Sequence, residues 1–212
     1  MASRIIHLAI AKLIADTKPE LNTDRFFLGS ILPDACRDRS AHYSIYVAER
    51  KKKTYDLTFF RKHYGELMLR DALYLGYYLH LLQDILFRRT MYEELQFDPI
   101  PDGNVARLHR DYQLTNRFVI QRFGLKPLQV VPDDLSEKPL WLAHSFALEE
   151  FLEEMRHDYL DCPQGHTVFF TEETALQYIE RSFETCRKEL EALNSGTGYF
   201  DELQYAWKRH KI

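Results

Sequence analysis

Residues 80–84, His-Leu-Leu-Gln-Asp, place an imidazole and a carboxylate four positions apart. On a helix, positions i and i+4 lie on one face with Cβ atoms roughly 5–6 Å apart, so His80 and Asp84 can share one metal ion. That face is otherwise apolar, which predicts that both side chains point into the core. A buried carboxylate is costly unless it is paired or bound to a cation. The alternative is a buried His–Asp hydrogen bond with a structural role.

Three more histidines lie in helical patterns. His7 and His144 each share a face with apolar residues, where a lone histidine is commonly a core residue with its hydrogen bonds satisfied. His109 begins a polar stripe with Gln113 and Asn116, at spacings i, i+4 and i+7. That stripe can equally face solvent.

A further carboxylate and imidazole lie before these helices. Asp34 follows Pro33, just past the predicted end of a short apolar segment, and His42 comes eight residues later. The three cysteines form no close-spaced pair, which argues against a disulfide framework and against a thiolate zinc site. Nitrogen and oxygen ligands without thiolate suit zinc, and also iron or manganese.

The elements that must position these side chains are predicted to be helical. Glycine is scarce, at 8 of 212 residues, and no segment alternates apolar and polar residues over the length of a strand. Residues 35–53, which end in a charged run, are expected to be irregular and exposed. The sequence predicts one all-α domain, residues 1–212, with about six or seven helices. We expect the main helices over residues 3–16, 54–96 (with a kink near Gly65), 104–123, 139–160, 172–194 and 199–209.

Composition excludes some classes of function. The chain has 28 basic and 32 acidic residues and a net charge of −4, which argues against a stable nucleic-acid complex formed by bulk positive charge. Enzymes acting on phosphate esters remain, because bound metal ions supply positive charge locally. No stretch reaches the ~20 apolar residues that a membrane span requires. Free thiols and the lack of an export signal favour the cytoplasm.

Four pieces of the sequence together resemble the zinc-dependent phospholipase C family, which is related in fold to the fungal single-strand-specific nucleases. They are Ile-His-Leu-Ala at 6–9, Phe-Leu-Gly-Ser-Ile-Leu-Pro-Asp at 27–34, the following His42, and Gly-Tyr-Tyr-Leu-His-Leu-Leu-Gln-Asp at 76–84. The resemblance covers roughly residues 3–90. It implies an all-α fold with a cluster of zinc ions in a cleft.

The resemblance also implies a ligand set. The best-supported ion would be bound by Asp34, His42, His80 and Asp84. His7 would bind a second ion that shares Asp84. His109 and His144 are further candidate ligands, so the expectation is one or two ions, zinc before iron or manganese.

The predicted function is hydrolysis of phosphate esters. A cation lowers the pKa of a bound water from 15.7 to about 7, and the resulting hydroxide attacks phosphorus. Asp34 is the candidate catalytic residue, as ligand or general base. The substrate is left open among a soluble phosphodiester, a nucleotide and a phospholipid headgroup, and the oligomeric state is not assigned.

Two other classes of function remain. The dipeptide His157-Asp158 is the kind of motif on which His-Asp metal phosphohydrolases are built. Alternatively, the chain is a non-catalytic helical domain, with histidines as hydrogen-bonding core groups or with one structural metal. A closed four-coordinate site would favour this last class.

Overall fold

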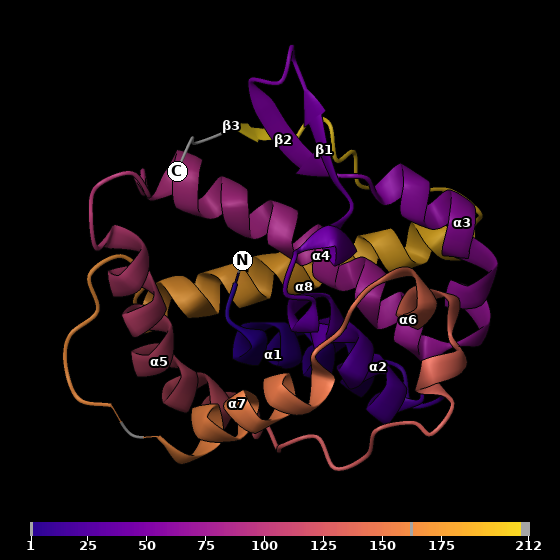
Figure 1. Ribbon diagram of the computed structural model, residues 1–212, viewed down its shortest axis with the longest axis horizontal. Helices are drawn as coiled ribbons and strands as arrows, with labels where there is room; N and C mark the ends of the chain where they lie inside the picture. The colour runs from indigo at the N-terminus through magenta and orange to yellow at the C-terminus, as the bar shows by residue number, and fades with distance from the viewer. Residues whose placement is uncertain (1, 162, 209–212) are drawn as a thin grey trace.

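The computed structural model describes residues 2–161 and 163–208, which fold into one compact domain with 63% helix and 6% strand (Figure 1). The described part of the chain contains eight α-helices and one small three-stranded sheet. The predicted helical class is therefore confirmed, with more and shorter helices than expected. None of the described helices combines the length and the apolar character that crossing a membrane requires.

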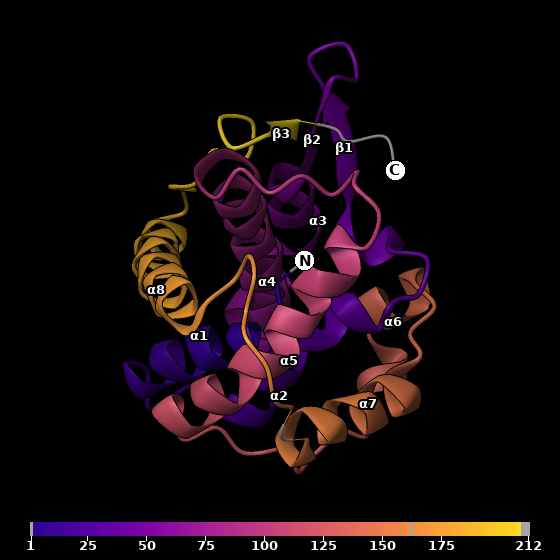
Figure 2. The same ribbon diagram turned by 90° about the vertical axis from the view of Figure 1, so that its left-hand side faces the viewer.

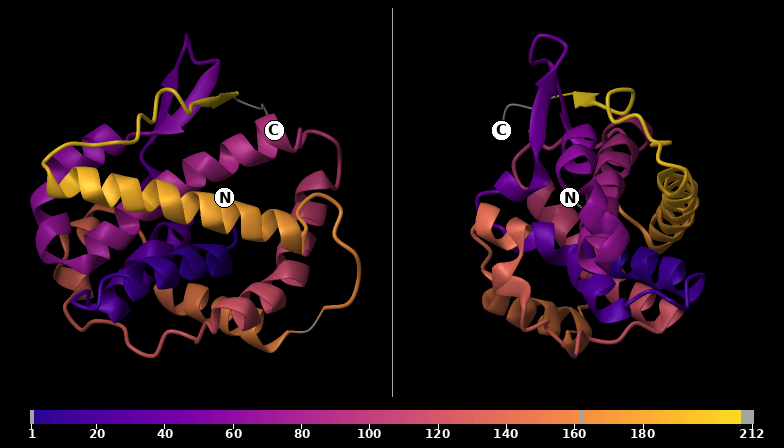
Figure 3. Two further views of the ribbon diagram at one scale, coloured as in Figure 1. Left: turned by 180° about the vertical axis from the view of Figure 1, so that it is seen from behind. Right: turned by 90° about the vertical axis from the view of Figure 1, so that its right-hand side faces the viewer.

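Helix α4 (Ala72–Arg89) lies at the centre of the molecule. Nearly every side chain from Leu73 to Phe87 is buried. In the two side views, α8 (Glu172–Asn194) lies on one side of α4, while α6 (Pro139–Ala143) and α7 (Leu148–Leu160) lie on the other (Figures 2 and 3). A polar residue on this helix therefore has no solvent to hydrate it and needs a partner inside the protein.

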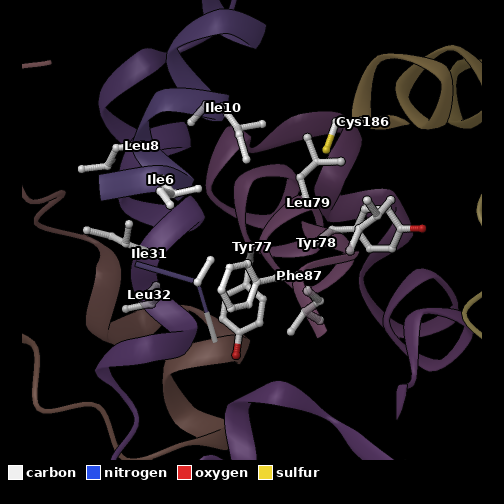
Figure 4. Close-up of a cluster of buried hydrophobic side chains, with 14 of the residues drawn as sticks. Ile6, Leu8, Ile10, Ile31, Leu32, Tyr77, Tyr78, Leu79, Phe87 and Cys186 are labelled. Atoms are coloured by element: carbon white, nitrogen blue, oxygen red, sulfur yellow. The ribbon is translucent and has the colours of Figure 1, made fainter. Parts of the chain in front are cut away.

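Helix α1 (Arg4–Asp16) begins at Ser3, whose side chain accepts a hydrogen bond from the Ile5 amide. The helix was predicted over residues 3–16, and a serine is a favoured N-cap residue. Its apolar side chains pack beside those of α4 in the core, and Figure 4 shows Ile6 and Ile10 of α1 near Leu79 of α4. This packing holds the first helix against the central one.

Helix α2 (Thr23–Ile31) crosses α4 at two glycines. A Cβ atom on Gly29 would lie 2.1 Å from the Leu73 carbonyl oxygen, and one on Gly76 would lie 2.2 Å from the Phe26 carbonyl oxygen. Any larger residue would collide with backbone at either position. The close approach also brings η1 (Leu32–Ala35), the 3₁₀ turn that follows α2, onto α4.

The prediction that residues 35–53 are irregular is wrong for part of this segment. After η2 (Ser40–His42), strands β1 (Ser44–Val47) and β2 (Lys52–Tyr55) form an antiparallel hairpin in which Ser44 pairs with Tyr55. The expected helix over 199–209 is also wrong for its described residues. A turn there leads into β3 (Trp207–Lys208), which pairs with β2. Strands this short leave no readable alternation in the sequence.

Two of the predicted long helices are each divided. The range 54–96 contains α3 (Leu57–Arg70), α4 and the π-helical turn η3 (Thr90–Glu94). The division falls at Asp71, not near Gly65, because Asp71 takes an extended backbone and caps α4 through the Leu73 amide. The range 139–160 is divided at residues 144–147, where His144 has an extended backbone.

The other two long helices match their predictions. Helix α5 (Asn104–Phe123) ends at Gly124, which adopts a φ of +60° in the left-handed region that favours glycine. Helix α8 begins after Thr171, whose hydroxyl accepts from the Thr174 amide. The short 3₁₀ turn η4 (Leu135–Glu137) precedes α6. Helices α5 and α8 both pack on α1, and together they cover the buried face of α1.

Candidate metal centre

Five of the seven predicted ligands come together on the inner face of α4. His80 and Asp84 lie on α4 itself, and the other three come from α1, η1 and η2. The side chains are buried, with Asp34 the most exposed at 9%. The five residues, called the centre from here on, are His7, Asp34, His42, His80 and Asp84.

The ligand atoms form two overlapping groups of three. Asp34, His42 and His80 make the first group, and His7, His80 and Asp84 make the second, with the atoms of each group within 4.8 Å of one another. In the first group, His42 Nε2 lies 3.3 Å from both His80 Nε2 and Asp34 Oδ1. In the second, His7 Nε2 lies 3.5 Å from Asp84 Oδ1. His42 Nε2 also lies 3.7 Å from Asp84 Oδ2, which joins the groups.

Outer hydrogen bonds set which ring nitrogen faces the centre. His80 Nδ1 lies 2.9 Å from the Ser30 carbonyl oxygen, and His7 Nδ1 lies 2.7 Å from Gln83 Oε1. Both oxygens can only accept, so each Nδ1 donates and each neutral ring presents the lone pair of Nε2 inward. Such outer partners orient metal-ligating histidines.

Two of the inward atoms make close contacts without forming a hydrogen bond. His7 Nε2 and Asp34 Oδ1 are fully buried and have no hydrogen-bond partner among the described residues, despite neighbours at 3.3–3.7 Å. His42 Nδ1, on the outer side of its ring, also has none. Buried polar atoms without partners are rare. Lone pairs that face a common point instead of one another fit a bound cation.

The electrostatics favour the ligating states of the two carboxylates and of His80. At His7, burial acts to lower the pKa, but the hydrogen bond and charge of Asp84, with the charge of Asp34, outweigh it and raise that pKa. Burial acts to raise the pKa of Asp34, but the charges of His80 and His42 outweigh it and hold that pKa below its usual value. Burial also acts to raise the pKa of Asp84, but the hydrogen bond to His7 and the charges of His7 and His80 help to lower it well below its usual value. Burial, with the charge of His7, lowers the pKa of His80 to about 3. At neutral pH both carboxylates are therefore ionised, and His80 is neutral.

Asp84 is supported by residues that sequence reasoning missed. Its Oδ1 accepts from the Ala2 amide at 3.0 Å, and its Oδ2 accepts from the Tyr55 hydroxyl at 3.3 Å. Each carboxylate oxygen can accept more than one bond, so both remain able to bind a cation. Tyr55 ends β2, in the range expected to be helical, so no helical pattern pointed to it. Its contact with Asp84 spans 29 positions of sequence.

His109 and His144 lie outside the two groups. His144 occupies the extended linker between α6 and α7, and both of its ring nitrogens are engaged. Nδ1 is 3.0 Å from Ser40 Oγ, and Nε2 is 2.9 Å from the Tyr43 hydroxyl. His109 is exposed on α5, with its ring 5.9 Å from that of Tyr112. The expectation that His144 faces inward from a continuous helix is wrong, because the helix stops one residue before it.

The His157-Asp158 dipeptide also lies apart from the centre. His157 is exposed, while Asp158 forms an ion pair with Arg4 and accepts from Asn116 Nδ2 at 3.0 Å. These residues line a cavity of about 260 Å³. The partners of Asp158 assign it to the contact between α1, α5 and α7.

Comparison with protein-family models, curated proteins and solved structures found no match to this chain. The resemblance over residues 3–90 therefore stays a prediction.

Proposed function

We propose that this protein is a metal-dependent hydrolase of phosphate esters, with zinc as its first-choice ion. The primary ion would be held by Asp34, His42 and His80, with Asp84 beside it, and a second position would lie between His7 and Asp84. The observation that carries the proposal is the cluster of buried ligand atoms within 4.8 Å of one another, two of which, His7 Nε2 and Asp34 Oδ1, have no hydrogen-bond partner among the described residues. Three imidazoles and two carboxylates without thiolate match the ligand preferences of zinc, and also of iron and manganese.

Within this proposal the residues have distinct roles. A bound divalent ion would supply Lewis acidity toward a phosphate oxygen and lower the pKa of a water. Asp34 is the candidate general base, because it lies on η1 and is the most exposed member of the centre. Ser30 and Gln83 orient His80 and His7 from behind. A soluble phosphodiester, a nucleotide and a phospholipid headgroup all remain substrates under this proposal.

One observation favours a second candidate, a structural metal site. Apart from Asp34, the side chains of the centre are at most 2% exposed. The groove of about 790 Å³ formed by α3 and the end of α8 is lined by other residues. An ion enclosed on all sides would link α1, η1, η2 and α4 without reaching a substrate.

Metal content is the first test. Protein purified without chelator or histidine tag is analysed by plasma mass spectrometry beside His80→Ala, Asp84→Ala and the control His144→Ala. We expect one or two equivalents of zinc, iron or manganese in the wild type and in His144→Ala, and loss from both variants of the centre. A folded wild type that is metal-free and takes up no added zinc would contradict both candidate functions.

Turnover then separates enzyme from structural site. Metal-loaded wild type is assayed with chromogenic phosphate mono- and diesters beside Asp34→Asn, with metal content measured in parallel. We expect Asp34→Asn to lower turnover by about 10²-fold or more, the size of a general-base contribution or larger. A wild type that holds its metal but hydrolyses none of these esters would favour the structural role.

A further inference from the structure

Arg88 is a largely enclosed cation one helical turn beyond Asp84. The two residues are four positions apart on α4 and therefore share a face. One guanidinium nitrogen, Nη1, donates to the Tyr92 hydroxyl at 2.9 Å. Its Nε is fully buried and has no hydrogen-bond partner among the described residues. Leaving a charged donor buried and unbonded is expensive, which indicates that an acceptor belongs there.

The nearby carboxylates do not satisfy Arg88. Asp84 contacts His7 and His42, and Glu93, one turn further along the chain, pairs with Arg89. Within residues 2–161 and 163–208, Arg88 forms no ion pair with a carboxylate. Its charge interacts with Tyr55, whose hydroxyl donates to Asp84, and with Asp84 itself at longer range. The guanidinium therefore lies within electrostatic range of the centre without forming an ion pair with it.

Two further residues with basic side chains act electrostatically in the same region as Arg88. Burial of part of the ring is the largest cause that lowers the pKa of His109, and the charges of Arg39 and Arg88 lower it further. The residue as a whole is exposed. Arg39 precedes η2, and His109 lies on α5. Basic residues from three separate elements thus lie within electrostatic range of one another. We call Arg39, Arg88 and His109 the basic rim.

Charge balance makes this rim informative. The two carboxylates of the centre carry two negative charges, which one divalent ion cancels and two divalent ions exceed. With metal bound, Arg88 becomes an uncompensated cation beside other cations, and such an arrangement is unfavourable unless an anion lies between them. A phosphate group has several oxygens that can contact metal and guanidinium together, and arginine binds phosphate through charge-assisted hydrogen bonds.

We propose that Arg88 is a substrate-positioning residue that binds a non-bridging oxygen of a phosphate group placed at the metal centre. The inference rests on the proposed function, because it needs a metal centre for the phosphate to reach. It goes beyond that function because Arg88, which is not a metal ligand, would recognise the phosphate group of the substrate. It also predicts that the product or free inorganic phosphate binds at the same place.

The test uses inorganic phosphate as the probe. Phosphate is titrated into metal-loaded protein by calorimetry for wild type, Arg88→Gln, Arg88→Lys and the control Arg89→Gln. Arg89 neighbours Arg88 on α4 but pairs with Glu93 and stacks over Tyr205. We expect Arg88→Gln to weaken phosphate binding about tenfold or more, with a smaller loss in Arg88→Lys, which keeps the charge but not the planar fork. Arg89→Gln should bind as the wild type does.

Metal content, measured in every variant, separates this inference from the proposed function. Arg88→Gln should keep its metal or bind it more tightly, because a nearby positive charge has been removed. If it keeps the metal and binds phosphate normally, the role of Arg88 is overturned while the metal centre stands. If it loses the metal, Arg88 supports the ligands and the inference is equally overturned.

Two remaining outcomes are also decisive. If Arg88→Gln does not fold, Arg88→Lys carries the comparison, and unchanged phosphate affinity in that variant counts against the inference. If the wild type binds no metal, the proposed function fails, and the metal-free protein is titrated instead. If the metal-free protein binds phosphate and Arg88→Gln abolishes that binding, the assignment of Arg88 to phosphate stands. If the metal-free protein binds no phosphate, the assignment of Arg88 is overturned together with the proposed function.

Discussion

At the scale of single residues, His80 is the most constrained member of the centre. Both groups of ligand atoms include it, yet its Nδ1 is committed to the Ser30 carbonyl oxygen, so only Nε2 can bind an ion. One nitrogen lone pair coordinates one ion. The short distances from His80 Nε2 to His42 and Asp34 indicate that a bound ion would be shared with these two residues, which would leave His7 and Asp84 to a second position.

This asymmetry predicts different effects for two neighbouring histidines. His42→Gln should remove the primary ion, because it deletes one of three ligands. His7→Gln should leave that ion in place and lose at most the second. Metal content after dialysis against a weak chelator measures the difference. Equal loss from both variants would show that the five residues form a single indivisible site.

At the scale of elements, the contact between α2 and α4 determines whether Asp34 reaches the centre. Because both glycines face backbone of the opposite helix, the two axes approach closely, and η1 is carried along behind α2. A glycine one turn before His80 leaves room for a backbone or a ligand to approach α4. The structure shows that it is a backbone.

Adding one methyl group at this contact tests its importance. Gly76→Ala should destabilise the protein by about 1–3 kcal/mol, because the new Cβ meets the Phe26 carbonyl at 2.2 Å and the helices must separate. Gly65→Ala is the matched control, since its Cβ would meet nothing within 4 Å and alanine is the better helix former by about 1 kcal/mol. Urea denaturation measures both. Gly76→Ala as stable as the wild type would refute the tight contact.

The elements also show what sequence reasoning could reach. Periodicity and capping residues locate α1, α5 and α8, and the spacing of His80 and Asp84 identifies the central pair. The break at Asp71 escapes that reasoning because apolar periodicity continues across it, and only the extended backbone of the residue ends α3. Tyr55 and Arg88 escape it as well, since their importance comes from contacts made between distant segments.

At the scale of the whole molecule, one ion-pair network joins three distant segments. Arg25 of α2 bonds Asp71 at the start of α4 with both Nε and Nη2, at 2.7 and 2.5 Å, and contacts Asp134 at 2.8 Å. Lys138, before α6, lies 3.2 Å from Asp71. Burial acts to raise the pKa of Asp71, but Arg25 and the Leu73 amide outweigh it, so the folded pKa lies below 3.8.

The sign of this pKa shift predicts an acid response. Because the folded-state pKa is depressed, the stabilisation is fully present above the unfolded value of 3.8 and is lost as pH falls through the folded value. Asp71→Asn, which can still cap α4, should cost about 1–3 kcal/mol at pH 7, and the cost should shrink below pH 4. Urea melts of the two proteins from pH 7 to pH 3 measure it. A cost that stays constant with pH would exclude the charge as its cause.

Residues from near both ends of the described chain support one carboxylate. The Ala2 amide bonds Asp84 directly, while Trp207 packs against Tyr55 with ring centroids 5.2 Å apart, and Tyr55 bonds Asp84 from the other side. Residue 2 leaves the ribosome long before residue 207. The carboxylate therefore acquires its full surroundings only after residue 207 has been synthesised, so a chain that stops just before Trp207 would carry all five residues of the centre without the ring that packs on Tyr55.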